Sequence, residues 1–155
     1  MVCGKHLFLT LQRGVEDWNF LRQKDPGWVM LNGVCLADAL LAGADLRCAF
    51  LIESDLSGAD LSRANLEKAL LRKANLRGSN LRQANIAGAD LCRADLSGAD
   101  LRDASLNGAF LRHANMHGAD LSTALGLTDT QIGDAFGDSG TILPSSLVRP
   151  ATWEH

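Results

Sequence analysis

The residues of this chain that could carry chemistry are few and lie far apart. Cys92, His113 and His117 are of the types that bind zinc, but they lack the short, regular spacing of zinc-ligand motifs. None of the cysteines forms a CxxC pair of the kind that metal and redox sites use. The sequence therefore predicts no metal site and places these side chains at tolerant outer positions. The four cysteines are Cys3, Cys35, Cys48 and Cys92.

Carboxylates are numerous, but their regularity argues against catalysis. Asp90, Asp95 and Asp100 follow one another at intervals of five, which indicates a structural role rather than an acid–base pair. The sequence contains no nucleophile–base constellation and no phosphate-binding loop. We therefore expect no enzyme activity, no catalytic residue and no cofactor.

Length and charge limit the other functions. The chain has 155 residues and a formal net charge of −3, which favours one domain without the basic excess that direct nucleic-acid binding needs. No stretch approaches the roughly 18 apolar residues of a membrane-spanning helix, and residues 1–14 lack the apolar run and cleavage site of a signal peptide. A reducing cytoplasm is the expected location, with neither membrane nor nucleic acid as a direct partner.

A five-residue repeat runs from about residue 33 to residue 125. Stepping by five from Leu36 to Leu121 gives 18 units, whose central residue, i, is Leu in all but two. The residue at i−2 is Ala in 15 units, and the residue at i−1 is Asp or Asn in 12. The remaining two positions, i+1 and i+2, are polar, variable or Gly.

A period of five fits neither a helix nor an isolated strand. Successive central residues would turn by about 140° on a helix and would alternate between the faces of a strand. If each unit is a short extended piece closed by a turn, i−2 and i both point inward, and the units bury them by stacking into a solenoid. The predicted core comprises Leu56, Leu61, Leu66, Leu71, Leu76, Leu81, Ile86, Leu91, Leu96, Leu101, Leu106 and Leu111.

The units ANLRG (74–78), ADLCR (89–93) and ADLSG (94–98) resemble the pentapeptide-repeat family, whose consensus is A(D/N)LXX. The resemblance implies an all-β solenoid, a right-handed quadrilateral β-helix with 20 residues per coil and about 4.5–5 coils. We expect Asp or Asn at i−1 to bond nearby backbone. Gly at i+2, as in Gly78 and Gly98, predicts a type II turn with positive φ, and units without that Gly are expected to use another turn.

Both ends of the solenoid are expected to be covered, because exposed strand edges invite polymerisation. Apolar residues at helical spacing predict a helix over 6–24, and Thr128-Asp129-Thr130-Gln131 is typical of a capping box that opens a short helix ending near Phe136. The tail from Gly137 is expected to be an irregular strap. These flanks also resemble those of bacterial pentapeptide-repeat proteins of unassigned role.

The expected domain organisation is therefore a single domain in three parts. They are an N-terminal helical cap (1–31), the pentapeptide-repeat β-helix (32–125) and a C-terminal cap of helix and tail (126–155). The three tryptophans lie in the two flanks, where we expect them to pack the caps. They are Trp18, Trp28 and Trp153.

One face of the coil departs from the Asp/Asn rule. It consists of the units centred on Leu51, Leu71, Leu91 and Leu111 and is named here the Phe50/Phe110 face. Apolar residues replace Asp or Asn at most of its i−1 positions, and basic residues flank them; interface hot spots favour aromatic and Arg side chains. The alternative is that the apolar residues merely accompany a different turn type and cover their neighbours, which pentapeptide repeats tolerate. The candidate interaction residues are Phe50, Ile52, Leu70, Arg72, Lys73, Arg93, Phe110 and Arg112.

These observations favour a non-enzymatic scaffold that presents a rigid surface to an unidentified protein partner, and the Phe50/Phe110 face also permits a homodimer. The family resemblance implies an alternative, because some members mimic B-form DNA and bind or protect DNA gyrase, which gives quinolone resistance. Such mimicry needs a strong negative field, whereas residues 33–125 hold 11 acidic and 10 basic residues. DNA gyrase is therefore the weaker candidate partner.

Overall fold

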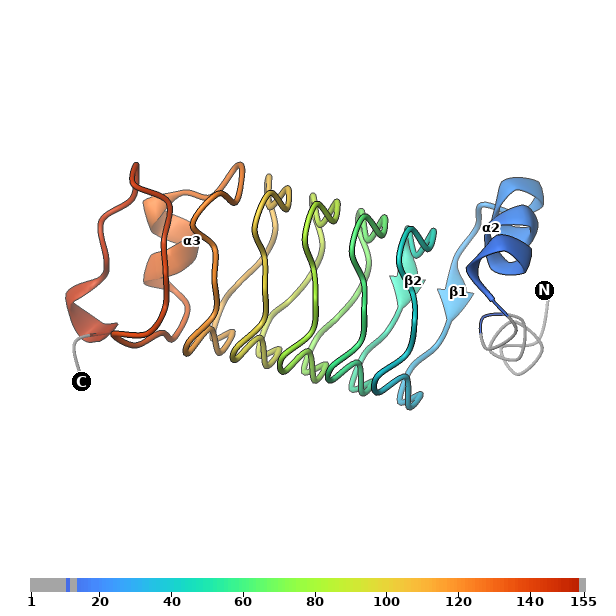
Figure 1. Ribbon diagram of the computed structural model, residues 1–155, viewed down its shortest axis with the longest axis horizontal. Coiled ribbons are helices and arrows are strands. Elements are labelled where there is room, and N and C mark those ends of the chain that lie inside the picture. Colours follow the sequence, from blue (N-terminus) through green and yellow to red (C-terminus); the bar gives the residue numbers. More distant parts are fainter. Residues whose placement is uncertain (1–10, 12–13, 154–155) are drawn as a thin grey trace.

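The computed structural model describes residue 11 and residues 14–153 of the chain. Figure 1 shows a row of stacked coils, with α2 near one end and α3 near the other. No helix among these residues combines the length and the apolar character that crossing a membrane requires. The elements are α2 (Val15–Lys24), β1 (Val29–Met30), β2 (Ala49–Phe50), α3 (Asp129–Gly133) and the 3-10 helix η1 (Ala151–Trp153).

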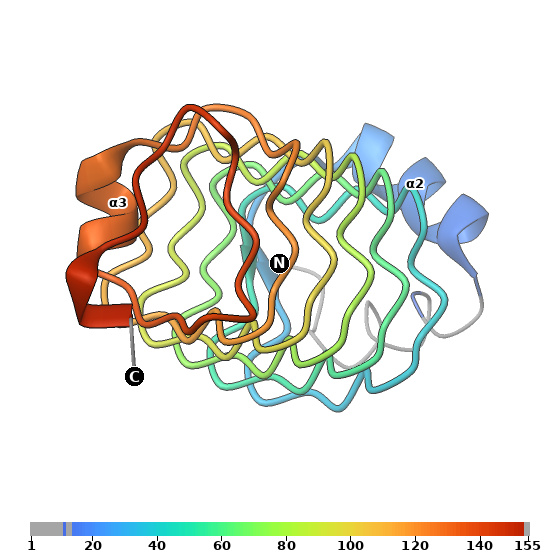
Figure 2. The same cartoon turned by 60° about the vertical axis from the view of Figure 1, so that its left-hand side comes forward.

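Each coil is 20 residues long, as predicted. Residues at i−1 pair in parallel with residues 20 positions later, so that Asp55, Asn75 and Asp95 form one column. The N–H of the central residue donates to a carbonyl of the next coil in 17 of the 18 units, as from Leu56 to Asn75 at 2.7 Å. Four such columns give the coil four sides, which are visible when the stack is viewed obliquely (Figure 2). The chain is therefore a four-sided β-helix.

Extended structure is shorter than the predicted all-β fold suggests. Within the part of the chain that the structure describes, only β1 and β2 count as strands, and the other pairings involve one residue at a time. The physical reason is the unit length, because a turn of four residues leaves a five-residue unit little extended backbone. Stability therefore depends on many isolated bridges in register rather than on long strands.

All 18 units close with the same main-chain bond, from the N–H of residue i+3 to the carbonyl of residue i, as from Ala59 to Leu56 at 3.2 Å. The prediction that units without Gly use another turn is wrong. Residue i+2 has a positive φ whether it is Gly78 (61°) or Gln83 (58°), and in the 18 units only Thr123 departs from this. The left-handed conformation costs a non-Gly residue about 1–2 kcal/mol, which the hydrogen bonds to neighbouring coils offset.

The interior contains the predicted residues. Every central residue on the predicted core list is at most 2% exposed, and the Ala residues between them are equally buried. Two units place Ser at the inward small position, and the hydroxyls of Ser54 and Ser79 donate to the carbonyls of Leu51 and Leu76. A buried hydroxyl with an acceptor costs little, so the column tolerates both serines.

Asp and Asn at i−1 stabilise the corner, as predicted. The carboxylate of Asp60 accepts the backbone N–H of Ser62 at 3.0 Å, and the same contact recurs in units with Asp or Asn. Neighbouring coils are also linked, because Asn80 donates to Asp60 at 3.0 Å. The side chain at i−1 therefore serves the backbone wherever it is Asp or Asn.

Side chains of α2 complete the hydrogen bonds of the first coil. Trp18 is fully buried and donates from its indole N–H to the carbonyl of Asp45 at 2.8 Å. Arg22, 1% exposed, donates to five carbonyls, including that of Arg47 at 2.7 Å. The hydrophobic pattern located this helix but not the role of Arg22. The observed helix is shorter than the predicted 6–24, whose first residues lie outside the described part.

The C-terminal segment continues the coil beyond the predicted limit at residue 125. The predicted capping box is present, with the Thr128 hydroxyl and the Gln131 side chain bonding each other's backbone. However, α3 ends at Gly133, and Phe136 pairs with Asn115 instead of extending the helix. Ile142 likewise continues the next column, so the tail, which is otherwise irregular up to η1, adds one further pairing to the ladder. The buried indole of Trp153 then donates to Ala135 at 3.0 Å.

Truncation of a central leucine tests the packed column. Leu81 is 1% exposed, so Leu81→Ala should lower the free energy of unfolding by about 2–5 kcal/mol through lost contacts and a cavity. Chemical denaturation followed by circular dichroism measures this loss. The matched control is Leu40→Ala, since Leu40 is 82% exposed and should change stability by less than about 0.5 kcal/mol. Equal effects of both changes would contradict the packing role.

Two glycines should respond differently to substitution. Gly98 has φ 66° and open space around a hypothetical Cβ, whereas a Cβ at Gly137 would overlap the Trp153 ring. Gly98→Ala should cost about 1–2 kcal/mol, and Gly98→Asn less, because Asn tolerates the left-handed conformation. Gly137→Asn should recover nothing relative to Gly137→Ala. Thermal unfolding of the four variants decides between backbone strain at Gly98 and steric overlap at Gly137. If the Asn variant is more stable than the Ala variant at both sites, this difference between the two glycines is refuted.

Candidate functional site

The residues that could have bound a metal do not come together. Among residue 11 and residues 14–153, no three His, Cys, Asp or Glu side chains form a group that could hold an ion. The ring of His113 instead stacks on Phe136, with centroids 5.6 Å apart. Burial, followed by the neighbouring carboxylate of Asp90, raises the pKa of Cys92, which is opposite to what a reactive thiolate or a metal ligand needs.

Several carboxylates are held by hydrogen bonds from basic side chains or backbone N–H groups. The Arg102 guanidinium lies 2.6 Å from Asp100, and this hydrogen bond holds the pKa of Asp100 below its usual value. In the described part of the chain, every resolved shift of a carboxyl pKa is downward. A general acid needs a raised pKa, so this set of carboxylates offers none.

The Phe50/Phe110 face carries a column of exposed and half-buried apolar side chains that the buried Asp90 interrupts. Parallel bridges place Met30, Phe50, Leu70, Asp90 and Phe110 in consecutive coils. Met30 is 54% and Phe110 59% exposed. Large apolar groups exposed in one column are unusual on a solvated surface and mark contact sites.

Trp28 extends this column and does not pack a cap. Its ring lies 5.1 Å from that of Phe50, and the side chain is 62% exposed. The prediction that all three tryptophans pack in the caps is therefore wrong for Trp28, because the chain has already entered the first coil at β1. Trp18 and Trp153 are buried. Nothing in the repeat pattern indicated Trp28, since it precedes the first recognisable unit.

The turn-type explanation of the apolar residues is wrong. On this face Glu53, Lys73, Arg93 and His113 all have positive φ between 57° and 61°, as in the units that carry Asp or Asn. The backbone therefore does not require Phe or Leu at i−1. The apolar residues change only the hydrogen bond at the corner. The N–H of Ile52, for example, cannot donate to the side chain of Phe50 and donates instead to the side chain of Asn32 in the preceding coil.

The basic residues of the face fall into two groups. Arg72 pairs with Asp90 at 2.5 Å, and Lys73 pairs with Glu53 at 2.7 Å. Arg93 and Arg112 form no ion pair with any described carboxylate. A hollow of about 300 Å³ at this corner brings the four predicted cations together, and its lining comprises Arg72, Lys73, Cys92, Arg93, Arg112 and His113.

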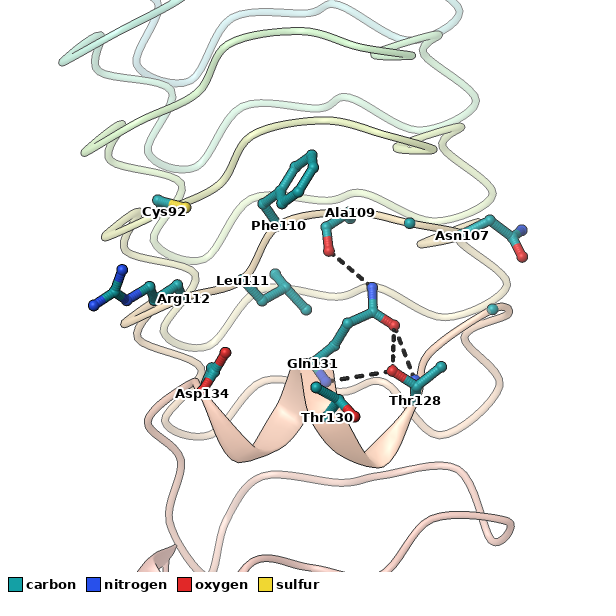
Figure 3. Close-up of a pocket in the computed structure, with 12 residues that line it drawn as sticks. Cys92, Asn107, Ala109, Phe110, Leu111, Arg112, Thr128, Thr130, Gln131 and Asp134 are labelled. Carbon is teal, nitrogen blue, oxygen red and sulfur yellow. Dashed lines mark hydrogen bonds between the residues drawn. The ribbon is translucent and has the colours of Figure 1, made fainter.

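A larger hollow of about 750 Å³ lies where this face meets α3. Figure 3 shows Phe110 above it and Arg112 at one side, with Gln131 rising from α3 toward the backbone of Ala109. The Gln131 amide donates to the Ala109 carbonyl at 2.8 Å. Sequence reasoning found Phe110 and Arg112, but it treated Gln131 only as half of a capping box.

Comparison with known proteins agrees with this geometry. The family described as pentapeptide repeats, with 8 copies, matches residues 35–72, 59–98 and 93–124. Together these segments cover more than half of the 155 residues. The chain belongs to the pentapeptide-repeat family. The right-handed quadrilateral β-helix of this family is the fold described above.

Three solved structures are among those similar to the chain. A pentapeptide-repeat protein from Nostoc PCC 7120 is 34% identical, with 84% of this chain and 86% of that chain covered and a TM-score of 0.31. One from the cyanobacterium Cyanothece 51142 is 27% identical, covering 81% and 97% with a TM-score of 0.48. A trypsin-treated variant of QnrB1, a plasmid-mediated fluoroquinolone resistance protein, is 23% identical with a TM-score of 0.48.

The alignment with the QnrB1 variant covers 76% of this pentapeptide-repeat chain and 59% of that one. No curated protein matches the sequence. The family assignment rests on the match of residues 35–124 to the pentapeptide repeats. The function must therefore be argued from the residues on the surface of this chain.

The Arg72–Asp90 pair predicts a pH effect. Burial raises the pKa of Asp90, but bonds from Cys92 and Arg72 outweigh it, so the folded-state pKa lies below the unfolded value of about 3.9. The pair therefore stabilises the protein above about pH 4, and this contribution is lost as the pH falls through the folded pKa.

Asp90→Asn keeps an acceptor for the N–H of Cys92 but removes the charge. We expect a loss of about 1 kcal/mol at pH 7, and the difference from wild type should shrink between about pH 4 and pH 2. Urea denaturation at several pH values measures it. A difference that stays constant or grows in acid would contradict this role.

Proposed function

We propose that this pentapeptide-repeat protein is a non-enzymatic scaffold that binds a partner protein through the Phe50/Phe110 face. The observation that carries the proposal is the column of exposed Trp28, Met30 and Phe110 and half-buried Phe50 and Leu70 along one side of a rigid shaft, which only Asp90 interrupts. Since the same turn occurs with Asp or Asn at i−1, the backbone gains nothing from these apolar residues. Their exposure is explained if they contact a partner.

The charges beside the column support the same role. Arg93 and Arg112 have no carboxylate partner within the described ranges, so their full charge faces solvent. Aromatic and Arg side chains dominate the energetics of protein interfaces, with exposed cations adding orientation and association rate. A partner surface with apolar and acidic residues would match this face.

DNA mimicry has weaker support. The columns of Asp that could imitate phosphates are neutralised by arginines, as where Arg102 lies 2.6 Å from Asp100 and 3.5 Å from Asp120. Arg82 and Arg77 lie beside Asp100 and Asp95 in the same way. A phosphate mimic needs an unneutralised negative surface, so action on DNA gyrase remains the less favoured proposal.

Replacement of two apolar side chains by charged ones tests the proposed face. The double change Phe50→Asp and Phe110→Asp should weaken partner binding by at least about tenfold, because buried interface aromatics contribute about 1–2 kcal/mol or more each. Affinity purification with cross-linking and mass spectrometry identifies the bound protein, and light scattering measures the molar mass. A homodimer would appear as a molar mass that halves in the double variant.

The matched control changes Leu40 and Leu125 to Asp. Both are exposed apolar residues at i−1, at 82% and 59%, but they belong to other faces. Their change should leave binding intact. If the double variant and this control retain the same protein equally, with unchanged molar mass, the proposed face is refuted.

A further inference from the structure

The ladder of hydrogen bonds from the central residues is incomplete at one unit. In 17 of the 18 units the N–H of the central residue donates to the next coil, and the exception is Leu111. On this side α3 stands where the next extended piece would lie (Figure 3). Leu111 is 2% exposed, and an orphaned N–H at such a position calls for a ligand or a water molecule.

The neighbouring positions of the missing piece are already filled. The Gln131 amide takes the place of its N–H by donating to the Ala109 carbonyl at 2.8 Å. The carbonyl of Asp134 accepts a hydrogen bond from the N–H of His113 at 2.6 Å, and so it replaces the last acceptor that the missing extended piece would have supplied. Between these two contacts only the N–H of Leu111 is left without an acceptor, so the corner lacks one carbonyl oxygen.

The hollow of about 750 Å³ lies at this corner and is lined by both Leu111 and α3. It has the size of a ligand-binding site. Phe110 and Ala109 supply an apolar wall, Arg112 supplies a positive charge, and the hydroxyls of Thr128 and Thr130 lie along α3. Asp134 also lines the hollow, and it does not form an ion pair with Arg112 in the described structure.

We infer that this hollow binds an extended peptide segment of a partner protein, in which an apolar residue is followed two positions later by an acidic residue. The spacing comes from the ladder. A segment that lies in the hollow beside α3 and supplies one carbonyl to Leu111 places the residue of that carbonyl opposite Phe110, where it continues the apolar column. The residue two positions on then lies beside Arg112, where a carboxylate complements the unpaired guanidinium.

This inference rests on the proposed function, because it takes the end of the Phe50/Phe110 face as the contact point. It adds a main-chain hydrogen bond, a sequence preference and a boundary for the site. The two ideas can be separated, since Phe50 lies three coils away from the hollow in the same column while Thr130 lies in α3.

The test uses the full chain, labelled with ¹⁵N, and a capped synthetic peptide, Ac-Ala-Leu-Ala-Glu-Ala-NH₂. The Leu111 amide resonance should move and saturate as the peptide is added. Replacing Glu by Lys in the peptide, or Arg112→Glu in the protein, should weaken binding at least about tenfold, since a hydrogen bond to a charged group contributes more than that factor. Thr130→Phe fills the hollow and should abolish the shift.

Leu40→Asp is the matched surface control and should bind the peptide as wild type does. Circular dichroism and melting establish that each variant is folded. Saturation of the Leu111 shift that depends on Glu, Arg112 and Thr130 supports the site. No shift, or a shift that survives Thr130→Phe and Arg112→Glu, overturns it. A Leu111 resonance that moves with protein concentration alone also overturns the inference, because it indicates that a second copy of the chain fills the site. A Leu111 amide that contacts only an ordered water molecule overturns it as well.

Partner binding separates this inference from the proposed function. If Phe50→Asp loses the protein captured by wild type and Thr130→Phe retains it, the peptide site fails and the face stands. If Thr130→Phe loses it as well, the site is part of the interface. If both variants retain it, both proposals fail.

Discussion

The whole molecule depends on one constraint, the 20-residue register of main-chain hydrogen bonds between successive coils. A coil is held to the next by bonds at the same four places, and these bonds align the leucines in columns and keep water out. The register also fixes the turn. Because i+2 must bond the next coil, residues such as Gln83 and Lys73 adopt the left-handed conformation that their side chains disfavour. Local preference is thus overruled by stacking, which is the usual source of stability in solenoids.

The same constraint creates a difficulty wherever the stack stops, since an end coil has bonding groups without a next coil. At the N-terminal end, Trp18 and Arg22 donate to carbonyls that a preceding coil would otherwise serve. At the C-terminal end, Phe136 and Ile142 continue two columns, while Gln131 replaces a third contact with its side chain. These substitutions use quite different residues for one purpose. They also leave the N–H of Leu111 open, so the incomplete corner is a direct consequence of how the coil ends.

The sequence alone was sufficient for whatever depends on the five-residue period. The buried central residues, the corner bonds of Asp and Asn, the 20-residue coil and the capping box at Thr128 could all be predicted because each is local or strictly repeated. The contact of Trp28 with Phe50, the bonds of Arg22 to Asp45 and Arg47, and the pairing of Phe136 could not, because each depends on residues far along the chain. The turn prediction failed for a related reason: it used the preference of single residues, and the neighbouring coils outweigh that preference.

The chemistry of the candidate face follows from replacing one residue type at one position. Where Asp occupies i−1, an arginine at i+1 pairs within its own unit, as Arg47 does with Asp45 and Arg102 with Asp100. Where Phe110 occupies i−1, Arg112 at i+1 has no such partner, and the ring itself is exposed. A single change from Asp to Phe therefore produces an aromatic surface and releases a guanidinium beside it. The proposed partner binding rests on this combination of an apolar group and an unpaired cation, since interfaces favour aromatic and Arg side chains.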